Sequence, residues 1–346
     1  MGEKHTARLE PVGIEMEVDE DETILDAAFR QGIMLMHGCK EGQCSSCKSF
    51  LLDGDVDLDR YSTFALPDFE EAEGYTLLCR AHALTDVEIE LLHYDEEGIR
   101  SGVPIITAKT EVEAVEQLTG DIRRLVLRVT EPEGLEFKAG QYVDIDIPGS
   151  SEDEHRSFSM ANAPGEPERL EFMIKLYEGG HFSGLLDDGI CAGDELTCKG
   201  PFGMFTLRDS SPRRLVFIAG GAGMAPVLSL LRSMAEKGTE RPATFYYGAR
   251  TSDDLFALEE IERLGGELPD FTFVPALSEA GEGGDWKGEA GLVTDVVDRL
   301  EDGDLTEVDA YLCGPPPMVD AAIALLERRG VPEAHIYFDR FTTTAA

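Results

Sequence analysis

The chain has 346 residues, 42% of them hydrophobic, which is enough for two or three domains with separate cores. Its 69 acidic and 30 basic residues give a formal net charge of −39, which argues against nucleic acid or an anionic membrane surface as a partner. The charge suits a protein partner with a basic docking face, but it equally fits a solubilising surface, possibly from a salty habitat.

The first module is predicted at residues 1–95. Helical spacing of apolar residues predicts a helix at 22–32. Alternating or apolar runs bounded by turn residues predict four strands, at 14–18, 49–52, 75–78 and 87–91.

Four cysteines of this module have the ligand spacing of a plant-type [2Fe-2S] cluster, C-x4-C-x2-C followed by a distant fourth: Cys39, Cys44, Cys47 and Cys79. A zinc site usually pairs two C-x2-C knuckles, and seven cysteines in 346 residues do not suggest a disulfide framework. We therefore predict a one-electron carrier. Because thiolate ligands must stay reduced and residues 1–11 lack a basic, apolar signal segment, we expect a cytoplasmic location.

A stretch rich in charge and turn formers, 96–104, predicts a linker. The second module, 105–210, has alternating strands such as 125–129 and 142–147. Glycine and proline punctuate these strands, as in a small antiparallel barrel.

Two motifs of the second module offer groups for a nucleotide. Arg156-Ser157-Phe158-Ser159 offers a guanidinium fork for a phosphate, an aromatic face and a hydroxyl that can bond a ring nitrogen. Residues 175–183 lead into a short helix whose free N–H groups can hold a second phosphate. The candidates in this second motif are Lys175, Gly180 and Ser183. Each motif alone is weak, because such short patterns are more often structural.

The third module, 211–346, repeats a strand, a turn and a helix three times. In the first repeat Gly221 and Gly223 let the backbone approach a pyrophosphate, and Pro226 suits the first turn of the following helix. The order predicts a doubly wound parallel sheet whose ligand lies at the carboxyl ends of the strands. The uncharged run 215–231 is therefore interpreted as a buried strand and helix rather than a membrane span.

The first module resembles the β-grasp plant-type ferredoxins, with all four ligands in place. The two other modules resemble the ferredoxin-NADP reductase superfamily. This resemblance implies that Arg156 meets the flavin phosphate, that Phe158 stacks on the flavin ring in place of the family's tyrosine, and that Ser159 lies near N5. The second motif would bind the pyrophosphate, which implies FAD rather than FMN.

The same resemblance concerns the turn Cys313-Gly314-Pro315, because the family's cysteine lies near the nicotinamide ring. Ser159 and Cys313 are therefore the predicted catalytic residues, although Cys313 alone would be interpreted as a buried filler. Gly314, Pro315 and Phe341 are further cofactor-binding candidates.

Coenzyme choice turns on the segment after the second strand of the third module. Arg250 is a candidate contact for a 2′-phosphate, but Asp253 and Asp254 follow it and would repel that group. The chain also resembles the reductases of monooxygenases, which are mostly NADH-dependent, and this resemblance implies NADH.

The domain order resembles that of reductase components of multicomponent oxygenases, in particular those of soluble di-iron monooxygenases of the propane and alkene type. The resemblance implies that electrons pass from NADH through FAD and the [2Fe-2S] cluster to a di-iron hydroxylase, with no nucleic acid and no membrane involved. Two alternatives remain open: a reductase for a Rieske ring-hydroxylating dioxygenase, and a redox sensor that uses the same groups without turnover.

Overall fold

The computed structural model describes residues 3–100, 102–150, 154–281 and 286–341. It contains two compact units, Met1–Ile106 with Gly200–Met204, and Thr107–Lys199 with Phe205–Ala346. The short segment belongs to the first unit because the ring of Phe202 packs against the rings of Phe29 and His37, at centroid distances of 5.7 and 6.2 Å.

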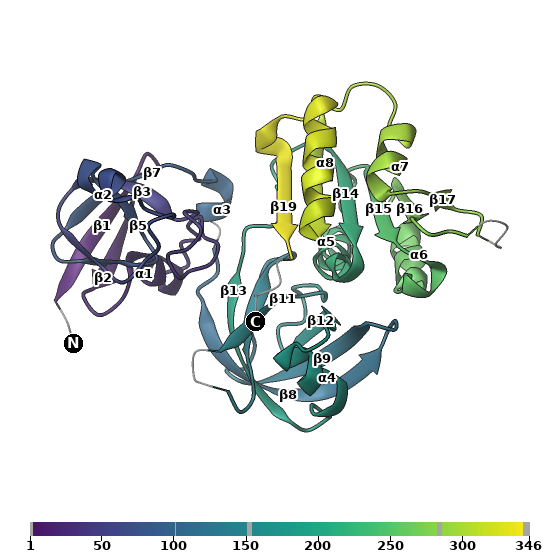
Figure 1. Ribbon diagram of the computed structural model, residues 1–346, viewed down its shortest axis with the longest axis horizontal. Helices are drawn as coiled ribbons and strands as arrows, with labels where there is room; N and C mark the ends of the chain where they lie inside the picture. The colour runs from purple at the N-terminus through teal and green to yellow at the C-terminus, as the bar shows by residue number, and fades with distance from the viewer. Residues whose placement is uncertain (1–2, 101, 151–153, 282–285, 342–346) are drawn as a thin grey trace. The chain divides into compact units, whose positions relative to one another are not determined.

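The first unit is built on a mixed sheet in the order β2-β1-β7-β3-β5 (Figure 1). Its β1 and β7 are parallel and its other neighbours are antiparallel. The strands are β1 (Lys4–Glu10), β2 (Ile14–Asp19), β3 (Lys48–Asp53), β5 (Tyr75–Leu77) and β7 (Val87–Leu91). Helix α1 (Ile24–Arg30) buries five of its seven residues, and the side chain of Thr23 caps its first turn. This arrangement is the predicted β-grasp fold.

Smaller elements complete this unit: β4 (Val56–Leu58), α2 (Asp68–Glu73), β6 (Ala81–Ala83) and α3 (Glu96–Arg100). Sequence patterns missed β1 and all four of these smaller elements, including α3, which begins the predicted linker. The Asp95 carboxylate accepts hydrogen bonds from the N–H groups of Glu97 and Gly98, which explains why a turn-forming sequence starts a helix here.

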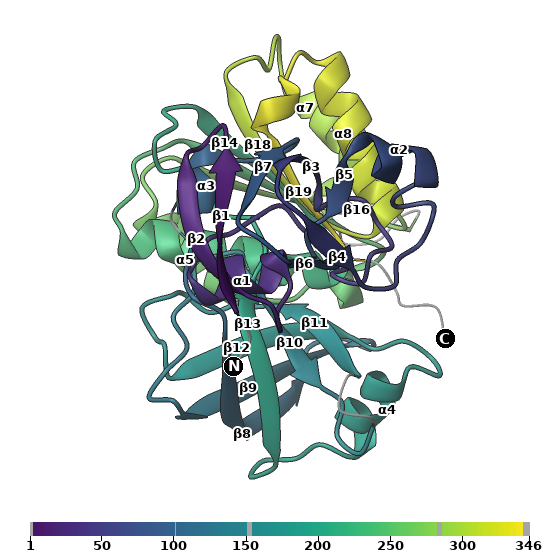
Figure 2. The same cartoon turned by 90° about the vertical axis from the view of Figure 1, so that its left-hand side faces the viewer.

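The second unit begins with an antiparallel sheet in the order β11-β10-β13-β8-β9-β12 (Figure 2). A bridge between Met160 and Phe172 connects the two ends of this order, so that the sheet nearly closes into the predicted barrel. Helix α4 (His181–Asp188) follows β12 in the chain. The strands are β8 (Ile106–Gln117), β9 (Ile122–Glu131), β10 (Tyr142–Asp146), β11 (His155–Ser159), β12 (Arg169–Lys175) and β13 (Glu195–Phe202).

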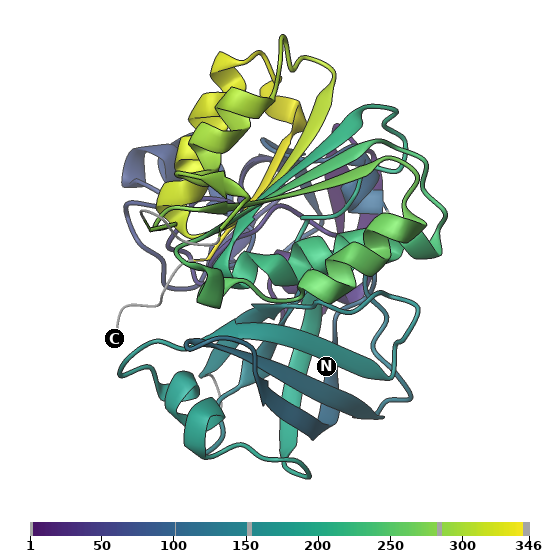
Figure 3. The same ribbon diagram turned by 90° about the vertical axis from the view of Figure 1, so that its right-hand side faces the viewer.

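A parallel sheet in the order β17-β16-β15-β14-β18-β19 completes the second unit. Separate apolar clusters cover its two faces: α5 and α6 contribute to one, and α7 and α8 to the other (Figure 3). The strands are β14 (Arg214–Gly220), β15 (Ala243–Ala249), β16 (Phe271–Leu277), β17 (Glu289–Ala290), β18 (Val308–Gly314) and β19 (Ile336–Arg340). The helices are α5 (Met224–Glu236), α6 (Leu258–Glu267), α7 (Val293–Leu300) and α8 (Pro316–Arg328).

The predicted doubly wound sheet is confirmed. The chain order reverses between β14 and β18, and ligands of such sheets bind where the order reverses, at the carboxyl ends of the strands. Within the described residues, no helix has the length and apolar character needed to cross a membrane.

Candidate functional site

The four predicted ligand cysteines come together in the first unit. Backbone N–H groups face their sulfur atoms: the N–H of Cys39 donates to Cys44 Sγ at 3.2 Å, and those of Glu41 and Gln43 donate to Cys39 Sγ at 3.4 and 3.2 Å. Such donors favour a thiolate over a thiol. Cys47 and Cys79 are buried, whereas Cys44 is exposed.

The cysteines interact in two pairs. A hydrogen bond from Cys39 lowers the pKa of Cys44 to about 4, and one from Cys79 lowers the pKa of Cys47. The pKa of each donor thiol rises in turn. Two interacting pairs of sulfur atoms on one unit offer a donor set for iron, which takes thiolates as ligands.

Glycines leave room around these sulfur atoms. A Cβ on Gly38 would lie 2.8 Å from Cys44 Sγ, and one on Gly42, whose φ is +68°, would lie 2.8 Å from Tyr61 Cβ. The loop therefore needs glycine at both positions, one for space and one also for its left-handed backbone. The donor set and this cradle fit a [2Fe-2S] cluster.

The first barrel motif lies on β11, the strand that follows β10 in the chain. The Arg156 guanidinium donates to His155 O at 2.7 Å and lies 3.6 Å from a Glu154 carboxylate oxygen. The Phe158 ring packs against Phe182 of α4, with centroids 4.9 Å apart. Thus β11 and α4 bring the first motif beside the second.

The second motif forms the turn before α4. Gly179 has a φ of +74°, Gly180 directly precedes the helix, and Ser183 Oγ accepts a hydrogen bond from the N–H of Tyr177 at 3.0 Å. An open cavity of about 570 Å³ is lined by this turn and by α4. The exposed glycine backbone and the helix start fit a phosphate group. Lys175 pairs with Asp121 at 3.1 Å.

The glycine turns after β14 and β18 interlock where the strand order reverses. A Cβ on Gly223 would lie 2.3 Å from Cys313 O, and one on Gly314, whose φ is +141°, would lie 2.9 Å from Gly220 O. The hydroxyl of Tyr247 donates to Gly221 O at 3.0 Å. These contacts fix the glycine backbone at the start of α5. Such a turn fits a dinucleotide pyrophosphate.

Both predicted catalytic residues lie close to an acid that sequence analysis did not single out, Asp339. Ser159 Oγ donates to Asp339 Oδ2 at 3.4 Å, and Cys313 is opposite Asp339 in the pairing of β18 with β19. Burial raises the pKa of Asp339 to about 6 and raises that of the Cys313 thiol well above its usual value. The N–H of Phe341 donates to Gly314 O at 3.0 Å, which brings the chain beyond β19 to the same place.

The sequence offered one signal for Asp339, its position in the aromatic segment 337–341 at the end of β19. A carboxyl group beside a hydroxyl and a thiol has the chemistry to hold or release a proton near neutral pH. Ser159 and Cys313 could be predicted from motifs, whereas Asp339 could be recognised only once the pairing of β18 with β19 was known.

Arg250 is held between carboxylates. Its guanidinium lies 3.2 Å from Asp254 and 3.7 Å from Asp121. The Thr251 N–H and hydroxyl fix the same Asp254 carboxylate, at 3.0 and 3.2 Å. Although burial pushes the pKa of Asp254 up, these hydrogen bonds and Arg250 bring it below the usual value, so the group stays ionised. The negative surroundings disfavour a 2′-phosphate.

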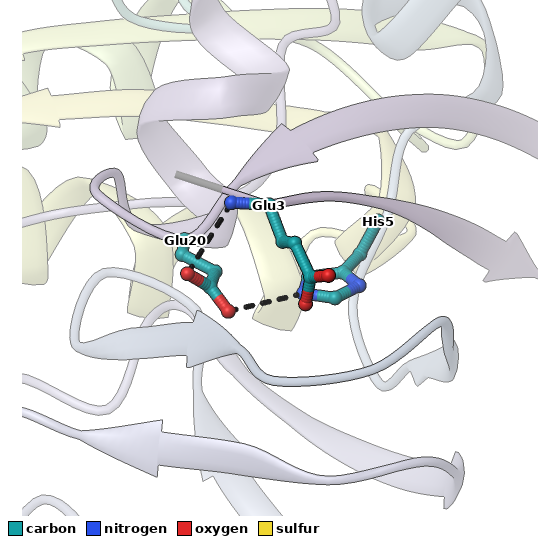
Figure 4. Close-up of side chains that lie close together, drawn as sticks. All are labelled: Glu3, His5 and Glu20. Atoms are coloured by element: carbon teal, nitrogen blue, oxygen red, sulfur yellow. Dashed lines mark hydrogen bonds and ion pairs between the residues drawn. The ribbon is translucent and has the colours of Figure 1, made fainter. Parts of the chain in front are cut away.

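A second group of ligand-type side chains lies apart from the four cysteines. Glu3, His5 and Glu20 have donor atoms within 4.8 Å of one another, where the start of β1 meets the end of β2 (Figure 4). Glu20 accepts from the N–H of Glu3 at 3.3 Å and lies 3.6 Å from His5 Nε2. These contacts tie the two ends of the hairpin together.

Three family models match the chain in succession. They are the 2Fe-2S iron-sulfur cluster binding domain over residues 7–84, the oxidoreductase FAD-binding domain over 109–207 and the oxidoreductase NAD-binding domain over 217–323. Their order agrees with the cysteine loop, the barrel motifs and the parallel sheet.

Full-length relatives are also similar. The propane 2-monooxygenase reductase component of Rhodococcus jostii is 55% identical, over 100% of this chain and 93% of that protein. The phenol 2-monooxygenase reductase component of a Pseudomonas species is 38% identical, over 99% and 95%. The crystal structure of the cytochrome P450 reductase of Amycolatopsis has a TM-score of 0.84 at 31% identity and covers 98% of this chain and 99% of its own.

Proposed function

The chain belongs to the family of monooxygenase reductase components, and from this premise we propose that it supplies electrons to a di-iron hydroxylase that oxidises propane or a related small hydrocarbon. The protein is an NADH-dependent iron-sulfur flavoprotein that transfers electrons to a monooxygenase. The hydroxylase and its hydrocarbon are the proposed part.

Bound FAD supplies the conversion between a two-electron donor and a one-electron carrier. Arg156 and the turn before α4 would hold its phosphates, and Phe158 would cover its ring. The glycine turns after β14 and β18 would hold the coenzyme, with Ser159, Cys313 and Asp339 beside its reactive end. The proposed domains are 1–95 for the cluster, 105–210 for FAD and 211–346 for NADH, with 96–104 as linker. We place the protein in the cytoplasm, where cysteine ligands stay reduced.

One observation supports the hydroxylase best. Propane 2-monooxygenase reductase components from three genera are 54–55% identical to this chain over at least 99% of its length. The electron transfer component of toluate 1,2-dioxygenase from Pseudomonas putida is 32% identical over 95%. This similarity keeps a dioxygenase as the second candidate acceptor, since both classes share the domain order.

Reconstitution separates the two acceptors. The purified reductase, with FAD and cluster in place, is mixed with NADH and either a propane-type di-iron hydroxylase with its accessory components or a toluate-type Rieske dioxygenase. Substrate-coupled NADH oxidation should be rapid with the first and at background with the second. Equal or faster turnover with the dioxygenase would contradict the proposal.

A further inference from the structure

Phe64 and Phe69 are the two most exposed aromatic side chains in the described part of the first unit. Phe64 is 92% exposed, the largest fraction among the exposed large hydrophobic residues of the described chain, and Phe69 is 65% exposed. Phenylalanine is among the residues most often buried, and exposed aromatic side chains in a cluster commonly mark a binding surface.

Phe64 is fixed beside the cysteine loop. The N–H of Ser62 donates to Gly42 O at 2.9 Å, and Ser45 Oγ donates to Ala65 O at 3.0 Å. The residues on either side of Phe64 are thus bonded to the loop that carries Cys39, Cys44 and Cys47, while its ring faces solvent. An electron transfer partner must come close to this loop, because the rate of electron transfer falls steeply with distance.

Helix α2, which begins four residues after Phe64, is strongly acidic, and its Glu70 binds Lys48, the residue after Cys47. Its sequence, Asp-Phe-Glu-Glu-Ala-Glu, contains no basic residue, and the helix buries none of its side chains. Asp68, Glu71 and Glu73 are exposed, although Glu71 accepts a hydrogen bond from the Tyr61 hydroxyl at 2.6 Å, and Glu70 is held by Lys48. So short a helix with no buried residue gains little from packing within its own unit, which leaves its apolar and acidic groups available to another molecule.

We propose that Phe64, Phe69 and the three exposed acids of α2, together the docking face, bind the oxygenase component that receives the electrons. The partner would present an apolar socket for Phe64 with a rim of lysine and arginine side chains for the acids. The buried aromatic group anchors the complex, and the opposite charges raise the association rate. The inference rests on the proposed function and adds the surface through which it is carried out.

The test uses the reductase with FAD and cluster in place and the di-iron hydroxylase component. Phe64→Ala is compared with Leu52→Ala, which also truncates an exposed apolar side chain but lies at the far end of β3 from Cys47. Calorimetry gives the dissociation constant, and stopped-flow absorbance gives the rate at which NADH reduces FAD and cluster. We expect Phe64→Ala to weaken binding about tenfold or more and Leu52→Ala by less than twofold, with internal reduction unchanged in both.

The role of the acidic side chains of α2 is tested by removing two of their charges. Asp68→Asn with Glu73→Gln should slow association severalfold at low salt and reduce its salt dependence. The matched control, Glu15→Gln with Glu90→Gln, removes two exposed charges of the same sheet unit outside the docking face and should change association much less.

Three outcomes would overturn the docking face. If Phe64→Ala binds the hydroxylase with wild-type affinity, Phe64 does not anchor the complex. If the two double charge variants slow association equally, the acids of α2 act only through the net charge of the protein. Slower internal reduction of the cluster in Phe64→Ala, with unchanged affinity for the hydroxylase, would make the surface a contact of the chain with itself. If the wild-type reductase neither binds nor reduces the hydroxylase, the proposed function fails, and the docking face for this partner fails with it.

Discussion

At the residue scale, the arginine and lysine candidates for nucleotide binding already have partners. Asp121 illustrates this, since it lies 3.1 Å from Lys175 and 3.7 Å from Arg250. A nucleotide phosphate at either cation must compete with this carboxylate. Sequence motifs predicted the cations but not the acid opposite them, because Asp121 is brought to both by the fold rather than by spacing along the chain.

Arg156→Ala should yield a protein poor in FAD. Loss of a charge-assisted hydrogen bond to a phosphate costs ~1.5 to 3 kcal/mol, or about ten- to a hundredfold in affinity. The FAD content after dilution, and its recovery with added FAD, measure the effect. Arg128→Ala, which removes an exposed arginine of β9 paired with Glu111, is the control. Normal FAD content in Arg156→Ala would show that Arg156 does not hold the flavin.

Asp254→Asn should raise kcat/KM for NADPH severalfold and leave kcat with NADH nearly unchanged. Two like charges about 5 Å apart at an effective dielectric near 20 repel by ~3 kcal/mol before salt screening, so Asp254 opposes a 2′-phosphate more strongly than one flexible arginine attracts it. Asp270→Asn, which removes an exposed charge of the same unit outside this turn, is the control and should leave the preference unchanged. If both variants keep the wild-type preference for NADH, Asp254 does not govern the choice.

Asp339→Asn should change the pH dependence of stability. The folded-state pKa of Asp339 is raised to about 6, above its usual 3.8, because burial penalises the carboxylate. The stabilisation of the protonated group is therefore complete below about pH 4 and is lost as pH rises through about 6. As pH rises through this window the wild type should lose up to ~3 kcal/mol of unfolding free energy that the variant keeps. Chemical unfolding at pH 5 and 7.5 measures this, and a constant difference would contradict the raised pKa.

At the element scale, patterns in the sequence predicted those strands and helices whose apolar residues recur regularly, such as α1, β7 and β14. They missed β1 and α3 for different reasons. The alternation in β1 is short and begins near the chain start, and α3 depends on a cap from Asp95 in a charged, turn-rich segment. The glycine turn after β14 was predicted as a phosphate site, but its second requirement, space for Cys313 O, is visible only once β18 lies beside it.

Gly223→Ala should therefore disrupt the dinucleotide turn. Its Cβ would lie 2.3 Å from Cys313 O, which is backbone and can move only if β18 moves. We expect a loss of about 2 kcal/mol or more in stability and weaker NADH binding. Gly266→Ala in α6, where the Cβ would meet nothing within 4 Å, should instead stabilise by about 0.5 to 1 kcal/mol. Thermal unfolding and NADH titration of both variants check this, and equal stabilities would contradict the close contact.

At the scale of the whole molecule, the sequence predicted the site groups better than their surroundings. The loop with Cys39, Cys44 and Cys47 and the glycine turns are recognisable from local motifs, and their roles as cluster ligands and nucleotide contacts stay predictions. Asp339 could not be found from motifs, because it is the pairing of β18 with β19 that places it opposite Cys313 and a side-chain hydrogen bond that joins it to Ser159. Composition gave the charge of −39 no location, whereas the structure concentrates part of it on α2, whose Glu70 binds Lys48 next to Cys47.

The central claim is that electrons leave NADH through FAD and reach the monooxygenase only through the four-cysteine site. Cys44→Ser tests it most directly, because serine oxygen is a poor replacement for a thiolate ligand while the FAD site lies in the other unit. In an anaerobic stopped-flow experiment with NADH, the account predicts that the variant loses or weakens the cluster absorbance, bleaches its FAD at the wild-type rate and no longer reduces the hydroxylase. Full hydroxylase-coupled activity in Cys44→Ser would contradict it.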